Sequence, residues 1–240
     1  MEIKQKEKKL SWQMFNSIAE KYDFTNRLLS FGIDIHWRKK LIPLFPKKNQ
    51  LRYLDLATGT GDVLITILSG LKSKVHNATG IDMAEKMIEI GNAKITKKNL
   101  NHIAKLKVGD ATNLDLPNNS YDTVTIAFGI RNLESFNKGL EEMFRVLDTN
   151  GRLLVLEFSF PKNKLFKNIY HFYLKNILPF LGGLVSGNFK AYRYLNKTIE
   201  QFPYGEAFTN HMKAAGFKNL KRHPLCFGIA TIYQGDKIVG

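Results

Sequence analysis

The stretch Leu51-Arg-Tyr-Leu-Asp-Leu-Ala-Thr-Gly-Thr-Gly-Asp-Val63 reads as a buried strand ending in an acid, followed by a glycine turn and the start of a helix. The apolar run Leu51–Leu56 is typical of a central parallel strand. Gly59 and Gly61 permit a sharp turn and a close approach of the backbone to a ligand. We expect Asp62 to lie where the first N–H groups of the helix are free. The pattern predicts a nucleotide-cofactor loop, with a ligand-free strand-turn-helix as the alternative for this stretch alone.

The glycine spacing and the acid distinguish two classes of cofactor. A dinucleotide-binding fingerprint has a third glycine, whereas this chain has Leu64 at that position. Asp55 precedes the turn, and a carboxylate would repel a pyrophosphate in a partly buried site. The same carboxylate suits a cation such as the ammonium end of S-adenosylmethionine. The loop therefore favours S-adenosylmethionine over a dinucleotide.

Two further acids follow predicted strands. Asp82 ends the run 77–82, about twenty residues past the loop, where an acid can accept hydrogen bonds from ribose hydroxyls. Asp110 follows the alternating run 103–109. A single such Asp is more often a turn former or helix cap. Three acids at successive strand ends favour a binding site.

Strands and helices alternate through residues 51–158, which predicts a parallel sheet with helices on both faces. Further strands are expected at 121–128 and 152–158. A helix at 204–215 and two strands, 217–222 and 227–233, close the chain as a hairpin-like pair. We therefore expect an α/β fold with a Rossmann-like, seven-stranded, mostly parallel sheet.

Two segments lie outside this alternation. Apolar residues at helical spacing in 10–40 predict an amphipathic helix pair that covers the strand ends as a lid. The aromatic-rich segment 160–202 predicts a helical insertion that either walls an apolar pocket or simply packs on the core. The predicted division is a lid (1–48), an S-adenosylmethionine-binding core (49–159), a substrate-pocket insertion (160–202) and a C-terminal helix and strand pair completing the core (203–240).

Composition narrows the class of protein. The formal net charge of +15 suits nucleic acid or an anionic membrane surface, although dispersed lysines also arise from compositional bias. Cys226 is the single cysteine, so we expect a reducing compartment and no metal. The chain shows no signal-peptide pattern and no run of about 18 apolar residues, which predicts a cytoplasmic protein.

Several motifs carry a family resemblance. Asp55-Leu-Ala-Thr-Gly-Thr-Gly61, Gly80-Ile-Asp82, Gly109-Asp-Ala111 and Gly151-Arg-Leu-Leu154 resemble the ordered motifs of class I S-adenosylmethionine-dependent methyltransferases. The more specific stretches are Phe15-Asn-Ser-Ile-Ala-Glu-Lys-Tyr-Asp23, Phe128-Gly-Ile-Arg-Asn132 and Ala191-Tyr-Arg-Tyr-Leu195. They resemble the ubiquinone/menaquinone biosynthesis methyltransferase family over nearly the whole chain. Ala57-Thr58, before the glycines, departs from the family pattern, but this position does not change the assignment to the family.

The resemblance implies methyl transfer from S-adenosylmethionine to a ring carbon of demethylmenaquinol or a related polyprenyl quinol. A carbon nucleophile of this kind needs exclusion of water, alignment and deprotonation of a neighbouring ring hydroxyl. The expected catalytic residues are Arg131, Asn132, Tyr22 and His171, with Asn26 and His36 as further candidates, and each histidine reads more simply as a packing or surface residue. The expected cofactor-binding residues are Asp55, Gly59, Thr60, Gly61, Asp82, Met83, Asp110 and Ala111.

The hydrophobic polyprenyl tail of the implied substrate and the positive net charge together predict peripheral association with an anionic membrane surface, on the inner face of the cytoplasmic membrane. A homodimer stays an open alternative. A ubiquinone precursor or another small aromatic or lipid is the alternative acceptor. A nucleic-acid methyltransferase is less favoured, because it would require either a nucleophilic cysteine in a better position than Cys226 or an N-P-P-Y type of motif. A non-catalytic S-adenosylmethionine-binding module is the other less favoured function. We therefore expect no nucleic-acid partner.

Overall fold

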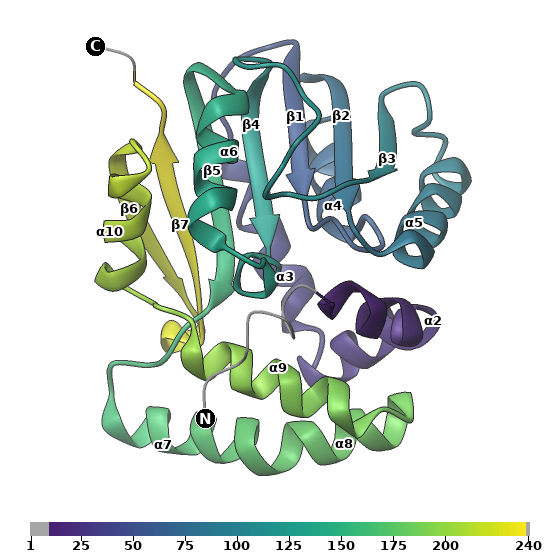
Figure 1. Cartoon of the computed structure of the whole chain (residues 1–240), viewed down its shortest axis with the longest axis vertical. Helices are drawn as coiled ribbons and strands as arrows, with labels where there is room; N and C mark the ends of the chain where they lie inside the picture. The colour runs from purple at the N-terminus through teal and green to yellow at the C-terminus, as the bar shows by residue number, and fades with distance from the viewer. Residues whose placement is uncertain (1–9, 239–240) are drawn as a thin grey trace.

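A computed structural model describes residues 10–238, and Figure 1 shows its arrangement. Seven strands form one sheet in the order β3-β2-β1-β4-β5-β7-β6. The strands are β1 (Leu51–Leu56), β2 (Val75–Asp82), β3 (Ala104–Val108), β4 (Tyr121–Ala127), β5 (Leu147–Phe158), β6 (Lys218–Leu225) and β7 (Ala230–Asp236). Residues 1–9 of the predicted lid and residues 239–240 of the predicted C-terminal segment lie outside the described part.

The sheet is parallel except at one strand. β1 to β5 pair in parallel, whereas β7 runs antiparallel between β5 and β6. All seven residues of β4 except its last are buried, because helices cover the central strands on both faces. The predicted seven-stranded, mostly parallel Rossmann-like sheet and its antiparallel ending are confirmed. The expected strand 152–158 is longer than predicted, because β5 begins at Leu147 directly after a helix.

Two helical layers bury the two faces of the sheet, since neighbouring residues of a strand point to opposite sides. Tyr53 faces α4 (Asp62–Leu71) and α5 (Glu85–Lys97) in one core cluster. Leu54 faces α6 (Phe136–Val146) and α10 (Glu206–Ala214) in the other. The sheet is therefore a rigid support for the loops that follow its strands.

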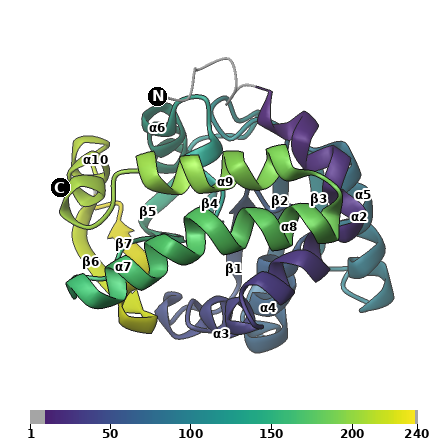
Figure 2. The same ribbon diagram turned by 90° about the horizontal axis from the view of Figure 1, so that it is seen from below.

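A third group of helices lies beyond the carboxyl ends of the parallel strands (Figure 1). It contains α2 (Ser11–Leu29) and α3 (Ile33–Lys39) from the N-terminal segment, which is followed by a 3-10 turn η1 (Ile42–Leu44) that contains Pro43. The insertion supplies α7 (Lys164–Phe172), a π-helical turn η3 (Tyr173–Ile177), α8 (Leu178–Ser186) and α9 (Phe189–Gln201). Figure 2 shows α7, α8 and α9 lying across this end of the molecule beside α2 and α3. In open parallel sheets, ligands bind at this end.

Candidate active site

The two glycines in the turn after β1 have different surroundings. Gly59 has a φ of +55°, and a Cβ built there would meet nothing within 4 Å. Gly61 has a φ of +77°, but its Cβ would lie 3.2 Å from Leu106 Cδ1. Gly59 therefore faces open space, whereas Gly61 begins α4 against the core and lines neither of the two cavities described below.

A smaller cavity of about 130 Å³ lies at the ends of β1, β2 and β3. Asp82 lines it, with Oδ2 accepting from the Gly59 N–H at 2.9 Å and Oδ1 from the Ala84 N–H at 2.8 Å. Burial raises the pKa of Asp82, against the opposing effect of these N–H donors. Each carboxylate oxygen has a second lone pair, so Asp82 retains acceptor capacity for a ligand. The predicted residues Met83, Asp110 and Ala111 line the same cavity.

Asp55 lies inside a chain of hydroxyl groups. Its carboxylate accepts from Thr58 Oγ1 at 2.6 Å and from Thr125 Oγ1 at 2.5 Å, and Tyr53 OH lies 2.8 Å from the same Thr125 oxygen. Burial raises the pKa of Asp55 to about 6, although the threonine hydrogen bonds oppose the shift. Asp55 also borders the larger cavity, where a cation would favour its ionised form.

A larger cavity of about 420 Å³ extends from the glycine loop beneath the helical group. Its walls come from segments far apart in the sequence: α2, α3, the loops after β1 and β4, the insertion, and the 3-10 turn η4 (Cys226–Gly228). Aromatic side chains dominate the insertion's share of the wall, so this part of the aromatic segment lines a pocket as predicted. The aromatic members there are Phe166, Tyr170, Tyr173, Tyr192 and Tyr194.

The two cavities share one wall. Tyr22, Gly59, Phe128 and Asn132 line both of them. Phe128 has a φ of +56°, a left-handed conformation that costs a non-glycine residue about 1–2 kcal/mol. Asn132 Oδ1 is buried and has no hydrogen-bond partner among residues 10–238. Backbone strain and an unpaired buried acceptor are features that often accompany a binding site.

Arg131 and Glu157 form a buried ion pair at the larger cavity. Arg131 Nη1 donates to Glu157 Oε1 at 2.7 Å and to the Phe128 carbonyl at 2.6 Å, and the two side chains are 4% and 0% exposed. Burial raises the pKa of Glu157, and the Arg131 charge opposes that rise. Arg131 Nε is buried without an acceptor in the described part of the chain. Arg131 lines the cavity, so it presents a charge held in place from behind by Glu157.

Sequence reasoning did not identify Glu157. The available signal was a single acid near the end of the apolar strand 152–158, since a buried carboxylate requires a partner. Its partner could not be assigned because 26 positions separate the two residues.

Tyr22 projects from α2 to the shared wall, with Asn26 hydrogen-bonded to it one helical turn later. Burial raises the pKa of Tyr22, while the Asn26 hydrogen bond and the Arg131 charge oppose the shift. The phenol is therefore protonated near neutral pH and can donate a hydrogen bond. Asn26 lines the larger cavity.

The two candidate histidines lie outside both cavities. His171 is half-exposed, with Nε2 3.8 Å from Glu200 Oε1. His36 is exposed on α3. Neither imidazole reaches the shared wall, so geometry does not support either as a catalytic base.

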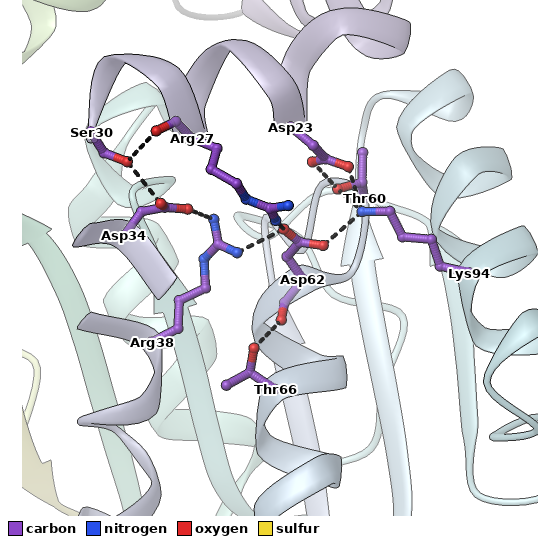
Figure 3. Close-up of polar contacts among 9 residues, drawn as sticks. All are labelled: Asp23, Arg27, Ser30, Asp34, Arg38, Thr60, Asp62, Thr66 and Lys94. Atoms are coloured by element: carbon purple, nitrogen blue, oxygen red, sulfur yellow. Dashed lines mark hydrogen bonds and ion pairs between the residues drawn. The ribbon is translucent and has the colours of Figure 1, made fainter. Parts of the chain in front are cut away.

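Charged side chains join the lid to the glycine loop (Figure 3). We call this group the rim cluster: Asp23, Arg38, Thr60, Asp62 and Lys94. Asp62 accepts from Arg38 Nη1 and from Lys94 Nζ, both at 2.7 Å. Thr60 Oγ1 donates to Asp23 Oδ1 at 2.6 Å, and Lys94 Nζ lies 2.5 Å from Asp23 Oδ2.

Asp62 lies in the first turn of α4, as expected, and its side chain takes part in the rim cluster. The N-cap of α4 is Gly61, and the Asp62 side chain turns toward the lid rather than capping the helix. Burial alone would raise the pKa of Asp62, but the charges of Arg38 and Lys94 outweigh it and hold the pKa below its usual value. The predicted site residue Thr60 lines the larger cavity while its hydroxyl contacts the lid.

The donor set fits S-adenosylmethionine. Asp82 offers acceptors for ribose hydroxyls at the smaller cavity, Gly59 leaves room for close approach, and Asp55 is a carboxylate within reach of a cation. With this sheet order, the chain has the fold of a class I S-adenosylmethionine-dependent methyltransferase. A solved S-adenosylmethionine-dependent methyltransferase of Thermotoga maritima shares that fold, with a TM-score of 0.66 at 20% identity, covering 94% of this chain and 99% of the other.

The chain belongs to the ubiE/COQ5 methyltransferase family, whose sequence model matches residues 2–237. A relative from Geotalea daltonii, called ubiquinone/menaquinone biosynthesis C-methyltransferase UbiE, is 44% identical, over 94% of this chain and 95% of its own. A relative from Thermus thermophilus, called demethylmenaquinone methyltransferase, is 45% identical, over 93% of this chain and 100% of its own. The family resemblance found in the motifs is thereby confirmed.

Proposed function

We propose that this protein transfers a methyl group from S-adenosylmethionine to a ring carbon of demethylmenaquinol, giving menaquinol and S-adenosylhomocysteine. The observation that carries the proposal is the shared wall between the two cavities. The smaller cavity has the acids suited to a nucleoside, and the larger one is apolar enough for a quinol with an isoprenoid tail. The names of the relatives from Thermus thermophilus and Thermotoga maritima, both demethylmenaquinone methyltransferase, support this acceptor.

The cofactor residues divide by cavity. Asp82, Met83, Asp110 and Ala111 would hold the nucleoside end at the smaller cavity. Asp55, Gly59 and Thr60 would hold the cationic amino-acid end where the loop borders the larger cavity. When bound, S-adenosylmethionine supplies a methyl group on a sulfonium, which needs little further activation.

The protein's own task is then to orient the acceptor and exclude water. Removal of a proton from a ring hydroxyl makes the adjacent carbon more nucleophilic and leaves negative charge on oxygen. Arg131 lines the larger cavity with its charge fixed by Glu157, so it is placed to stabilise that oxygen. Because an Arg does not readily accept a proton, a water ordered by Arg131 is the base that this arrangement favours.

Tyr22 and Asn132 would position the same ring. The protonated Tyr22 phenol can donate to a ring oxygen, and the unpartnered Asn132 Oδ1 can accept from a ring hydroxyl. Both lie at the wall that the two cavities share. Their opposite hydrogen-bonding roles would fix the orientation of a hydroquinone.

The proposed acceptor is tested by competition among substrates. The protein is incubated with methyl-labelled S-adenosylmethionine and, separately, with short-tailed demethylmenaquinol, a demethylated benzoquinol precursor and tRNA. We expect label on the naphthoquinol. Label confined to the benzoquinol or to tRNA would replace the proposed acceptor, and cofactor binding without transfer to any of them would indicate a non-catalytic module.

The proposed role of Arg131 is tested with Arg131→Ala. Loss of one electrostatic stabiliser should lower turnover about 100-fold. Affinity for S-adenosylmethionine should stay within about twofold, since the Arg131 side chain bonds to Glu157 and the Phe128 carbonyl and to none of the expected cofactor-binding residues. Wild-type turnover would remove Arg131 from the mechanism.

A lipid acceptor also leads us to propose peripheral association with an anionic membrane on the inner face of the cytoplasmic membrane. The net charge of +15 supports this part of the proposal. Within residues 10–238, the structure contains no helix with the length and apolar character needed to cross a bilayer.

A further inference from the structure

The helix formed by α7, η3 and α8 has two apolar sides. Tyr170, Leu174 and Leu178, at a spacing of four, are buried toward the core. Leu165, one turn before Tyr170, and Phe172, between Tyr170 and Leu174, are 67% and 60% exposed. An amphipathic helix needs only one apolar side to pack on a protein core, so the second one requires another explanation.

The outer side continues along α8, where Phe180 and Leu184 are 61% and 66% exposed. We call the exposed apolar surface of Leu165, Ile169, Phe172, Phe180 and Leu184 the outer face. Figure 2 views the end of the molecule on which α7 and α8 lie. The outer face therefore forms a stripe along two consecutive helices rather than a scatter of single side chains.

The mouth of the larger cavity joins this surface. Phe31, Phe166 and Phe227 line the cavity and are also exposed, Phe31 to 79% and Phe227 to 78%. Phe166 on α7 stacks on Phe227, with ring centroids 5.0 Å apart. Tyr173 OH donates to the Leu29 carbonyl at 2.5 Å, which holds the turn carrying Phe31 beside η3. The cavity thus opens between apolar side chains that are continuous with the outer face.

The charged side chains of α7, η3 and α8 are all basic, whereas Glu200 of α9 lies 3.8 Å from His171. Residues 158–199 contain six Lys and one Arg but no Asp or Glu. Lys164, Lys167 and Lys175 are exposed on α7 and η3, and Lys167 Nζ lies 6.0 Å from the centroid of the Phe160 ring. Lysines that flank an apolar stripe can bury their stems while the ammonium groups reach lipid phosphates.

We propose that the outer face is the docking surface for an anionic bilayer, and that the larger cavity opens directly into the acyl region. This inference rests on the proposed function for the direction of transfer, because a polyprenyl quinol resides in the bilayer. A second copy of this chain fits the surface less well. An isologous dimer across the outer face would oppose two copies of α7 and α8, which with η3 carry lysines and no acids.

Vesicle binding tests the apolar contribution. The variant combines Phe172→Ser, Phe180→Ser and Leu184→Ser, since these three side chains do not line either cavity. Its partition onto vesicles of equal parts phosphatidylcholine and phosphatidylglycerol should fall at least about tenfold. Val108→Ser removes an exposed aliphatic side chain of β3 and should leave binding unchanged. Wild-type binding by the triple variant, or no binding by the wild type at low salt, overturns the inference.

Charge reversal tests the electrostatic contribution. A triple change to Glu at Lys164, Lys167 and Lys175 should weaken binding more than the same change at Lys97, Lys98 and Lys105, which are exposed lysines around α5 and β3. Each basic residue near an anionic surface contributes on the order of a fivefold change in partition. Equal losses in the two variants would mean that net charge alone, and no particular face, drives binding, and would overturn the inference.

A direct measurement does not depend on the multiple variants. Tryptophan placed by Phe172→Trp should be quenched by brominated acyl chains beyond the background of Trp12 and Trp37, whereas Val108→Trp should not. Equal quenching at the two positions would overturn the inference. So would wild-type dimers that the Phe172, Phe180 and Leu184 variant dissociates without losing vesicle binding.

Failure of the membrane inference and failure of the proposed function are separable. Methylation of a short-tailed demethylmenaquinol in detergent does not require a bilayer. Activity in detergent with no difference between the outer-face variant and wild type on vesicles would overturn the docking surface and leave the proposed reaction intact. Vesicle binding with no methylation of the quinol would support the surface and overturn the reaction.

Discussion

The Arg131–Glu157 pair and the rim cluster use the same ion-pair chemistry in different surroundings. Arg131 and Glu157 are 4% and 0% exposed, whereas Arg38 and Asp62 are 12% and 22% exposed and Lys94 is 26% exposed. In residues 10–238, Arg131 and Glu157 form an ion pair only with each other, whereas Asp62 has Arg27, Arg38 and Lys94 around it. Loss of either Arg131 or Glu157 would therefore leave a buried charge without its counter-charge. In the more exposed rim cluster, water and the remaining charges can compensate for the loss of one partner.

We expect the largest loss of stability and turnover when Glu157 is replaced. Glu157→Gln leaves the Arg131 charge buried without a counter-charge, which should cost about 3–5 kcal/mol in the free energy of unfolding. The displaced guanidinium should lower turnover about 100-fold. Denaturant unfolding and single-turnover kinetics measure the two effects.

Two further variants decide whether burial is the cause. Glu142→Gln breaks a more exposed pair with Arg145 and should cost at most about 1 kcal/mol with unchanged turnover. Arg131→Met combined with Glu157→Leu should recover stability but not activity. A Glu157→Gln protein as stable and active as wild type would show that burial does not make the Arg131–Glu157 pair more important than the rim cluster.

Asp55 sharpens the comparison, because it is a buried acid bonded to hydroxyl groups instead of a cation in residues 10–238. Its raised pKa means that folding favours the protonated form. That stabilisation is complete below the usual carboxyl pKa and is lost as the pH rises through about 6.

A cationic ligand has the opposite preference, since it favours ionised Asp55. Affinity for S-adenosylmethionine should therefore fall, by about tenfold, between about pH 7 and pH 5, with proton release on binding at the acid end. Calorimetry in buffers of different ionisation enthalpy measures both quantities. Asp55→Asn should bind more weakly at neutral pH and lose the pH dependence, whereas the exposed Asp115→Asn should behave as wild type. An unchanged pH profile in Asp55→Asn would separate Asp55 from the cofactor.

A smaller effect is expected at the rim cluster. Arg38→Ala leaves Lys94 and Arg27 near Asp62, while Asp34 loses its cation and keeps the Ser30 hydroxyl as a donor, so the lid should loosen by about 1–2 kcal/mol. Hydrogen exchange of the α2 amides should quicken at low salt, with less difference from wild type at high salt. Lys39→Ala, at the exposed neighbouring position, is the control. A loss as large as that of Glu157→Gln would show that exposure does not separate the two clusters.

The smallest effect is expected at His171. This side chain is half-exposed beside Glu200 and lines neither cavity. His171→Ala should keep turnover within about twofold, because a catalytic base would contribute at least about 100-fold. A loss of that larger size would return His171 to the mechanism and would require the lid or the insertion to move during turnover.

The sequence by itself determined the sheet, the glycine turn and the row of acids at the ends of β1, β2 and β3. Each is encoded within a short segment, and parallel strands bring their carboxyl ends to one edge whatever the distant residues are. The motifs at residues 15–23 and 128–132 similarly sufficed for the family resemblance. The antiparallel final pair followed from the two apolar runs after α10.

Only the tertiary structure decided which polar groups meet. Glu157 reaches Arg131 across 26 positions. Asp62 pairs with Arg38 across 24 positions and with Lys94 across 32, so its side chain joins the lid to the glycine loop as well as lying in the first turn of α4. His36 and His171, for which the sequence favoured a packing or surface role over a catalytic one, both lie at the surface. Local pattern reports which side chains tend to be buried, whereas an ion pair depends on distance and desolvation between distant segments, and these exist only once the chain has folded.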